Sequence, residues 1–168
     1  PNTAVGFGAL FANLTGTNNV AVGDQALASN TASNNTALGS VAAINNTTGT
    51  SIVAIGTGAL YSNTSGSNNT AVGQGASNKN TIGQSNTAIG TNSLYRNVDG
   101  ADNVASGVNA LFNNVSGNAN VAVGLDCLLN NTASNNVAVG WRSLTSNTSG
   151  TPNTAFGYQA LQNNLTGT

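Results

Sequence analysis

The sequence predicts an all-β protein, a parallel β-solenoid or β-roll of ten coils. The segment Asn-Thr/Val-Ala-Val/Ile-Gly recurs ten times in 168 residues, at spacings of 16 or 17 residues. A period this short holds one solenoid coil but cannot hold a pair of helices. Residues 1–168 are therefore expected to form one repeat array. Its ten glycines, called strand glycines here and counted as position 0 of each coil, are Gly6, Gly23, Gly39, Gly56, Gly73, Gly90, Gly107, Gly124, Gly140 and Gly157.

The three residues before each strand glycine predict a short strand. Positions −3 and −1 are mostly β-branched or aliphatic, as in Thr70 and Val72, and position −2 is Ala in all ten coils. Alternation with a period of two is typical of a strand, and we expect one parallel, in-register strand in each coil. Ten coils stacked at about 4.8 Å would give a rod about 48 Å long. We expect the β-branched face to line the interior. The alanines then lie on the opposite face, covered by the second half of the coil or by another chain.

The second half of the coil has a different pattern. Position +3 is Ala, Ser or Cys, position +4 is Leu in eight coils, and position +8 is Thr, Val or Leu. This spacing favours a short helical turn, with a second short strand as the alternative. Two copies have lost one residue in the turn before Thr36 and before Val137. We expect only a tighter loop there, with Leu38 and Val139 kept inside.

Position +7 is Asn without exception, and Asn also recurs at position −4. A buried Asn can donate and accept amide hydrogen bonds with the coils above and below, so we interpret these residues as structural ladders. The +7 ladder comprises Asn13, Asn30, Asn46, Asn63, Asn80, Asn97, Asn114, Asn131, Asn147 and Asn164. The alternative is N-glycosylation at Asn13, Asn63, Asn114, Asn147 and Asn164, because each of them begins a formal acceptor sequence.

Composition argues against several classes of function. Charged residues make up only 4% of the chain and the net charge is −1, which excludes an electrostatic nucleic-acid binder. There is no His and one Cys, so we expect no enzyme, no cofactor, no metal site and no internal disulfide. Asp99 and Asp102 are the only close acidic pair, too few ligands for a calcium loop. We interpret Cys127 as a packed thiol, and no segment is apolar enough to predict a membrane span.

Two surface features suggest contacts. The position after the strand glycine carries large apolar residues in four coils, and this row is a candidate contact surface: Phe7, Leu125, Trp141 and Tyr158. The Thr residues at position −3 suggest a regular array that orders water, as in an ice-binding solenoid. Val interrupts that row in five coils, which favours an interior or half-buried face instead.

The repeat Asn-Thr-Ala-Val-Gly-x-x-Ala-Leu-x-x-Asn-x-Thr-Gly, as in residues 2–16, resembles the repeats of phage-type tail fibres and bacterial surface fibres. It is also similar to the repeats of trimeric autotransporter adhesin heads, which are parallel β-rolls assembled as homotrimers. The resemblance implies an extracellular structural segment, a window of a longer fibre protein, with adhesion as a further role. It implies self-association as a trimer or filament but says almost nothing about a ligand. A cell-surface or glycan target is compatible with a fibre of this kind. The alternative is a receptor-, glycan- or ice-binding module.

Overall fold

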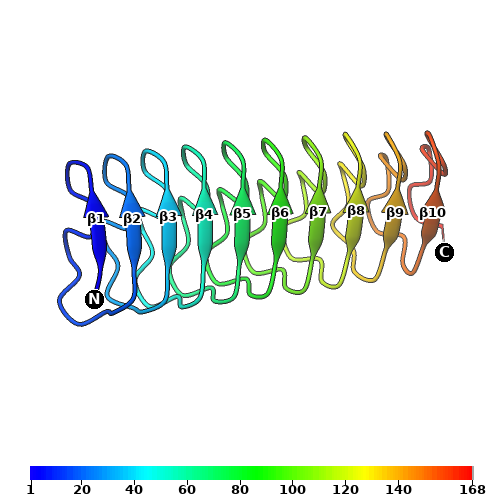
Figure 1. The fold of residues 1–168 in the computed structure, drawn as a ribbon. Coiled ribbons are helices and arrows are strands. Elements are labelled where there is room, and N and C mark those ends of the chain that lie inside the picture. The colour runs from blue at the N-terminus through cyan, green and yellow to red at the C-terminus, as the bar shows by residue number, and fades with distance from the viewer. Residues whose placement is uncertain (168) are drawn as a thin grey trace.

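The chain folds as one parallel β-solenoid. The computed structural model describes residues 1–167, which contain ten three-residue strands and no helix. Each coil contributes one strand, so the strands stand side by side along a rod with the chain ends at opposite tips (Figure 1). The strands are β1 (Thr3–Val5), β2 (Val20–Val22), β3 (Thr36–Leu38), β4 (Val53–Ile55), β5 (Thr70–Val72), β6 (Thr87–Ile89), β7 (Val104–Ser106), β8 (Val121–Val123), β9 (Val137–Val139) and β10 (Thr154–Phe156).

The ten strands form one sheet in sequence order, and every neighbouring pair is parallel. Register follows the repeat, because Ala54 pairs with Ala71 and Ala71 pairs with Ala88. The sheet confirms the prediction of one parallel, in-register strand per coil. Identical side chains therefore lie one above another along the whole rod.

The assignment of the strand faces was wrong. The strand alanines point inward, and those of β2 to β9 have no exposed surface. Positions −3 and −1 point outward instead, and Leu38 and Ile89 remain 47% and 45% exposed. The cause is the narrow interior, where the second half of the same coil lies against the strand. Ala71 faces a space already occupied by residues such as Leu60, so two β-branched side chains per strand would not fit.

The second half of the coil is a chain of tight turns, so neither the helical turn nor a second strand is present in residues 1–167. In the second coil, Ala26 N–H donates to the Gly23 carbonyl, and Ala28 N–H donates to the Gln25 carbonyl. Gln25 and Leu27 have φ of 55° and 52°. Positive φ at alternate residues lets positions +3 and +4 both face inward. Two adjacent buried positions also occur on the buried face of a helix, which is why the sequence pattern favoured a helical turn.

The two shortened coils keep the strand register, as expected. Ala37 pairs with Ala21 across the first deletion, and Ala138 pairs with Ala122 across the second. Only the loop is tighter. Leu38 and Val139 lie on the outward face with the other residues of position −1, so the expectation that they stay inside was wrong although the repeat alignment is correct.

The strand glycines mark a close approach between the backbones of successive coils. A Cβ atom added to Gly73 would lie 2.6 Å from both the carbonyl carbon and the carbonyl oxygen of Gly90, and Gly73 has φ of +136°. Neither the conformation nor the space suits another residue. Gly157 has a similar φ of +121°, but its Cβ would meet nothing within 4 Å.

This contrast supplies a test of coil stacking. We expect Gly157→Ala to lower the free energy of unfolding by about 1–2 kcal/mol, the cost of positive φ alone. Gly73→Ala adds a steric overlap with fixed backbone, so we expect a further loss of about 1–3 kcal/mol. Denaturant unfolding monitored by circular dichroism measures both. Equal losses for the two variants would contradict the close approach at Gly73.

Candidate functional site: interior ladders and two outward faces

The Asn residues at position +7 form the predicted ladder inside the rod. Asn80 is fully buried, and its Nδ2 donates to Oδ1 of Asn63 at 2.8 Å and to the Gly83 carbonyl at 3.0 Å. Its own Oδ1 accepts from Nδ2 of Asn97 at 2.7 Å. One amide thus links three coils and closes its own turn. Burial of a polar side chain is stable here because each of these groups has a partner.

A second ladder runs through position −4. Oδ1 of Asn86 accepts the backbone N–H of Asn103 at 3.0 Å, and Nδ2 of Asn86 donates to the Gly100 carbonyl at 2.8 Å. Ile52 occupies this position in the fourth coil and is fully buried. The backbone N–H of Ile52 still donates to Oδ1 of Asn35, at 3.1 Å, so the preceding coil keeps its contact.

The shortened turns disturb the +7 ladder next to them. Asn30 donates to the Ala32 carbonyl, two residues ahead rather than three, and its bond to Asn13 is long at 3.4 Å. At the second deletion, Oδ1 of Asn114 is buried and has no hydrogen-bond partner among residues 1–167. The deletions therefore weaken one ladder step each and leave the strands unchanged.

The five asparagines predicted as glycosylation candidates belong to this same ladder, as does Asn46, which also begins an acceptor sequence and is fully buried. Asn63, Asn114 and Asn147 have no exposed surface, and Asn13 and Asn164 are partly buried. The Nδ2 atom that would carry a glycan donates hydrogen bonds inside the rod, as in the Asn63 bonds to Asn46 and Gly66. A glycan on Asn63, Asn114 or Asn147 would require the coil to open.

The ladder predicts a large cost for Asn80→Ala. The substitution removes three buried hydrogen bonds and leaves Asn63 Oδ1 and Asn97 Nδ2 each without one partner. We expect a loss of about 3 kcal/mol or more in the free energy of unfolding. Asn163→Ala is the matched control, because Asn163 is exposed, and we expect a change within about 0.5 kcal/mol. Chemical denaturation compares them, and similar losses would contradict a structural ladder.

Cys127 is a buried thiol, as expected, in the position that is Ala in seven coils. Its Sγ donates to the Ala138 carbonyl at 3.2 Å. Burial raises the pKa of the Cys127 thiol from 9.0 to about 11, because the interior does not solvate a thiolate. The protonated thiol is therefore the form that fits the folded chain.

This pKa shift predicts a loss of stability at high pH. The thiol ionises in the unfolded chain at a lower pH than in the folded chain, so its contribution is complete below pH 9 and is lost as the pH rises towards 11. We expect the stability difference between the unaltered chain and Cys127→Ala to shift by about 2–3 kcal/mol over this range. Urea unfolding at several pH values measures it. A constant difference would contradict the assigned shift.

The outward residues of the sheet form the first exposed surface, here called the strand face. It consists of positions −3 and −1 of all ten coils, twenty residues that are all Thr, Val, Ile or Leu except Ser106 and Phe156. Several are well exposed in the inner coils too, including Leu38 at 47%, Ile89 at 45% and Val123 at 38%. No residue of the strand face carries a charge. Exposed surface of this kind marks an interaction site more often than a solvated one.

The turns carry a second exposed surface, here called the lateral face, at positions +1, +2, +5 and +6. The row expected at position +1 is exposed, with Phe7 at 82% and Trp141 at 37%. Trp141 and Tyr158 are in contact, with ring centroids 4.9 Å apart. A second aromatic row at position +5 was missed, although the repeat alignment contains it: Phe11, Tyr61, Tyr95 and Phe112.

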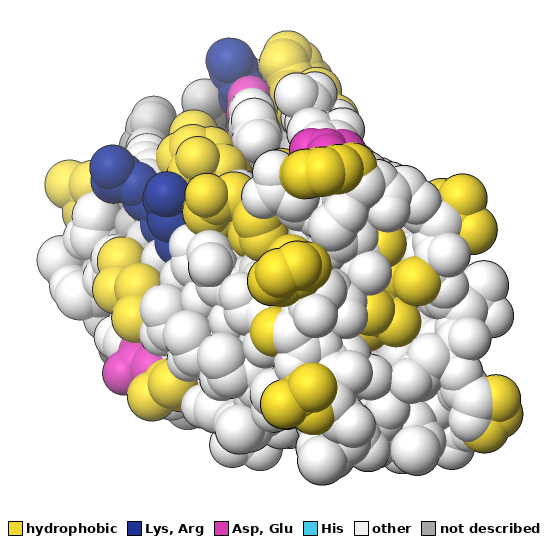
Figure 2. Space-filling view, turned by 90° about the vertical axis from the view of Figure 1, so that its left-hand side faces the viewer, with side chains coloured by type: hydrophobic (Ala, Val, Ile, Leu, Met, Phe, Trp, Pro, Cys, Tyr) yellow, Lys and Arg dark blue, Asp and Glu magenta, His cyan; other side chains and the backbone are white. Residues whose placement is uncertain are grey.

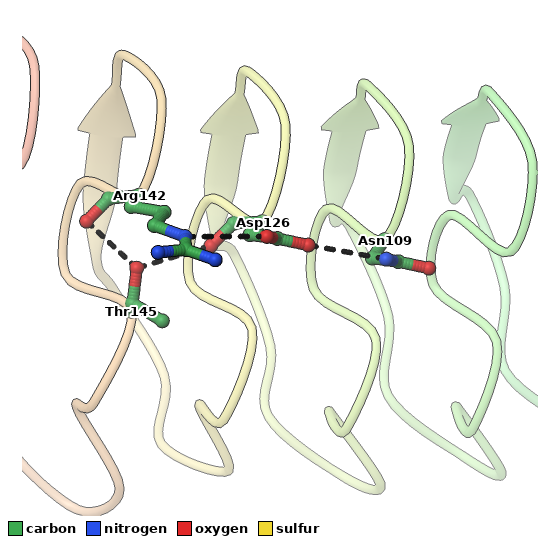
Figure 3. Close-up of polar contacts among 4 residues, drawn as sticks. All are labelled: Asn109, Asp126, Arg142 and Thr145. Atoms are coloured by element: carbon green, nitrogen blue, oxygen red, sulfur yellow. Dashed lines mark hydrogen bonds and ion pairs between the residues drawn. The ribbon is translucent and has the colours of Figure 1, made fainter.

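Position +2 of the lateral face holds a polar network (Figure 3). Nδ2 of Asn109 donates to Oδ1 of Asp126 at 3.1 Å, and Nε of Arg142 lies 3.4 Å from Oδ2 of Asp126. The Arg142 guanidinium also lies over the Trp141 ring, 5.0 Å from its centroid. Asp126 and Arg142 are therefore tied into a chain of side chains that crosses three coils, not isolated surface charges.

The rest of the surface offers little chemistry. Figure 2, which views one end of the rod, shows few charged side chains, and the basic ones lie on one side. Asp99 and Asp102 stay in an exposed turn, and residues 1–167 contain no group of three or more His, Cys, Asp or Glu side chains that could hold a metal ion.

Comparisons with protein families, with curated proteins and with solved structures found no match. Within residues 1–167 there is no helix that is long and apolar enough to cross a membrane. The strand face and the lateral face are the two exposed surfaces on which a function can be based.

Proposed function

We propose that this chain is a self-associating structural segment of an extracellular fibre, with the strand face as the surface between copies. The single observation that carries the proposal is the composition of that face. Its twenty side chains are uncharged and mostly aliphatic, yet they point to solvent in a single chain. Burying them against other copies would remove this apolar surface from water.

The repetitive extension of the strand face, rather than its area over ten coils, supports the proposal. Ten strands at about 4.8 Å and three residues of width give roughly 480 Å² of projected area. This area lies within the range of about 300–600 Å² for the largest apolar patch of an ordinary monomer. Because each added coil extends the face, the contact strengthens with the number of repeats. Three copies around one axis would match the resemblance to trimeric adhesin heads, and staggered copies would give a filament.

A non-catalytic role fits the residues available. The chain has no His and seven charged residues in all, while its interior is occupied by ladders that hold the coils together. Three basic residues also leave few cleavage sites for trypsin-like proteases. An extracellular rod benefits from both properties, and adhesion would then depend on the lateral face.

Ice binding is a second candidate, favoured by one observation. The Thr and Val residues of position −3 point outward in a regular array rather than inward. Position −1 varies from Ser106 to Leu38 and Phe156, which makes the second row uneven. An ice-recrystallisation assay on the unaltered chain tests this candidate, and inhibition at micromolar concentration would favour it over the structural role.

Charge placed on the strand face tests self-association. We expect the unaltered chain to be oligomeric at about 50 µM and Val72→Lys/Ile89→Lys to weaken its association at least 100-fold, because lysines would lie in an apolar contact. Sedimentation velocity measures the mass, and circular dichroism verifies that the separated chains remain folded.

The matched control adds the same charge elsewhere. Thr57 and Thr91 are exposed at position +1, so Thr57→Lys/Thr91→Lys should stay assembled. A monomeric unaltered chain, or a Val72→Lys/Ile89→Lys variant that remains oligomeric, would overturn the proposal.

A further inference from the structure

The lateral face contains a small recess between the seventh and eighth coils. It is lined by Asn109, Phe112, Asn113 and Leu129 and has a volume of about 250 Å³. That is below the roughly 300–1,000 Å³ of sites for drug-sized molecules, so it suits one small ring. The four residues come from positions +2, +5 and +6, so two apolar side chains and two amides line the recess together.

The aromatic ring of Phe112 is fixed by a neighbour. Tyr95 stacks on it with centroids 5.1 Å apart and an angle of 4° between the planes. Tyr95, in the sixth coil, in turn lies against Gly75 of the fifth coil, because its ring is 3.5 Å from the place that a Cβ atom on Gly75 would occupy. One face of Phe112 is therefore covered, while the ring also borders the recess with Leu129. The apolar part of the recess is thus held in place before any ligand arrives.

The two amides are also held in place. Nδ2 of Asn109 donates to Asp126, and Nδ2 of Asn113 donates to Oδ1 of Asn130 at 2.9 Å. Oδ1 of Asn113 accepts from Nη1 of Arg96 at 3.4 Å. Each Nδ2 has a second hydrogen, and within residues 1–167 Oδ1 of Asn109 accepts no hydrogen bond. Both amides are therefore ordered and keep hydrogen-bonding capacity that no residue of 1–167 uses, which lowers the ordering cost of binding a ligand.

We propose that this recess binds one pyranose unit of a neutral glycan chain. A pyranose has an apolar C–H face that can lie against Phe112 and Leu129, and equatorial hydroxyls that the two amide groups can bind. The lining residues carry no charge, and the nearest charged side chains, Arg96 and Asp126, already bind the recess amides. A neutral ligand fits this surface better than an anionic one. This inference rests on the adhesive part of the proposed function and names its ligand class. Glycan binding in the recess does not require self-association.

The unaltered chain should bind at least one neutral hexasaccharide. The probes are cellohexaose, maltohexaose, laminarihexaose, mannohexaose and chitohexaose, with a heparin hexasaccharide as the anionic comparison, all measured by titration calorimetry. Phe112→Ala should weaken the binding about tenfold or more, and Asn109→Gly should also weaken it. Both substitutions suit the fold, because position +5 is Ala28 in the second coil and position +2 is Gly58 in the fourth.

Tyr61→Ala is the matched control, since Tyr61 belongs to the same aromatic row but lies three coils from the recess. The affinity of this variant for the glycan should equal that of the unaltered chain. The proposal is overturned if no neutral probe binds at millimolar concentration, if only the heparin fragment binds, or if Phe112→Ala binds as tightly as the unaltered chain. Sedimentation velocity on Phe112→Ala separates the two proposals. Assembly should persist in this variant even when glycan binding is lost.

Discussion

The fold depends on one constraint, the short distance between coils. Successive strands of a sheet lie about 4.8 Å apart, so every side chain meets its own counterpart above and below. A charge repeated at such a position would face a like charge, whereas aromatic rings can repeat because they pack on one another, as Tyr95 and Phe112 do. Only residue types that can pack against the same residue type in the next coil can recur at one position of the repeat. The backbone approach at Gly73 and Gly90 is a clear case, because not even one methyl group fits.

Asn satisfies that constraint in the interior better than an apolar residue would. Its amide has a donor and an acceptor, so each copy can donate to the previous coil and accept from the next without a change of geometry. The second hydrogen of Nδ2 reaches the carbonyl three residues ahead, as from Asn80 to Gly83, and fixes the turn. One residue type thus joins coils and shapes the loop. Ile52 indicates that the second ladder tolerates an interruption when the flanking coils remain bonded.

The narrow interior also explains the outer surface. Ala, Leu and Asn fill the space between the strand and the turns, so the larger aliphatic side chains of the strands have nowhere to go but outward. The fold therefore creates an uncharged apolar face along its whole length. The lateral face is free of that requirement. Its residues vary from coil to coil, and the recess at Phe112 arises where an aromatic stack and two bonded amides happen to be adjacent.

The sequence by itself determined the architecture. Stacked coils need similar residues at equivalent positions, so the 16- or 17-residue period is visible in the sequence. Strand positions, register, the Asn ladder and the tolerance of the two shortened turns all followed from spacing alone. Alternation of side chains, in contrast, tells which residues share a face and not which face is inside. Thr70 and Val72 were assigned inward for their hydrophobicity, whereas the turns opposite leave room only for Ala71. The positive φ angles at residues such as Gln25 and Leu27 were equally invisible, since neither residue is a glycine. Only the tertiary structure decided these points. They depend on which side chains of the strand and of the turns fit together in the narrow interior of the coil.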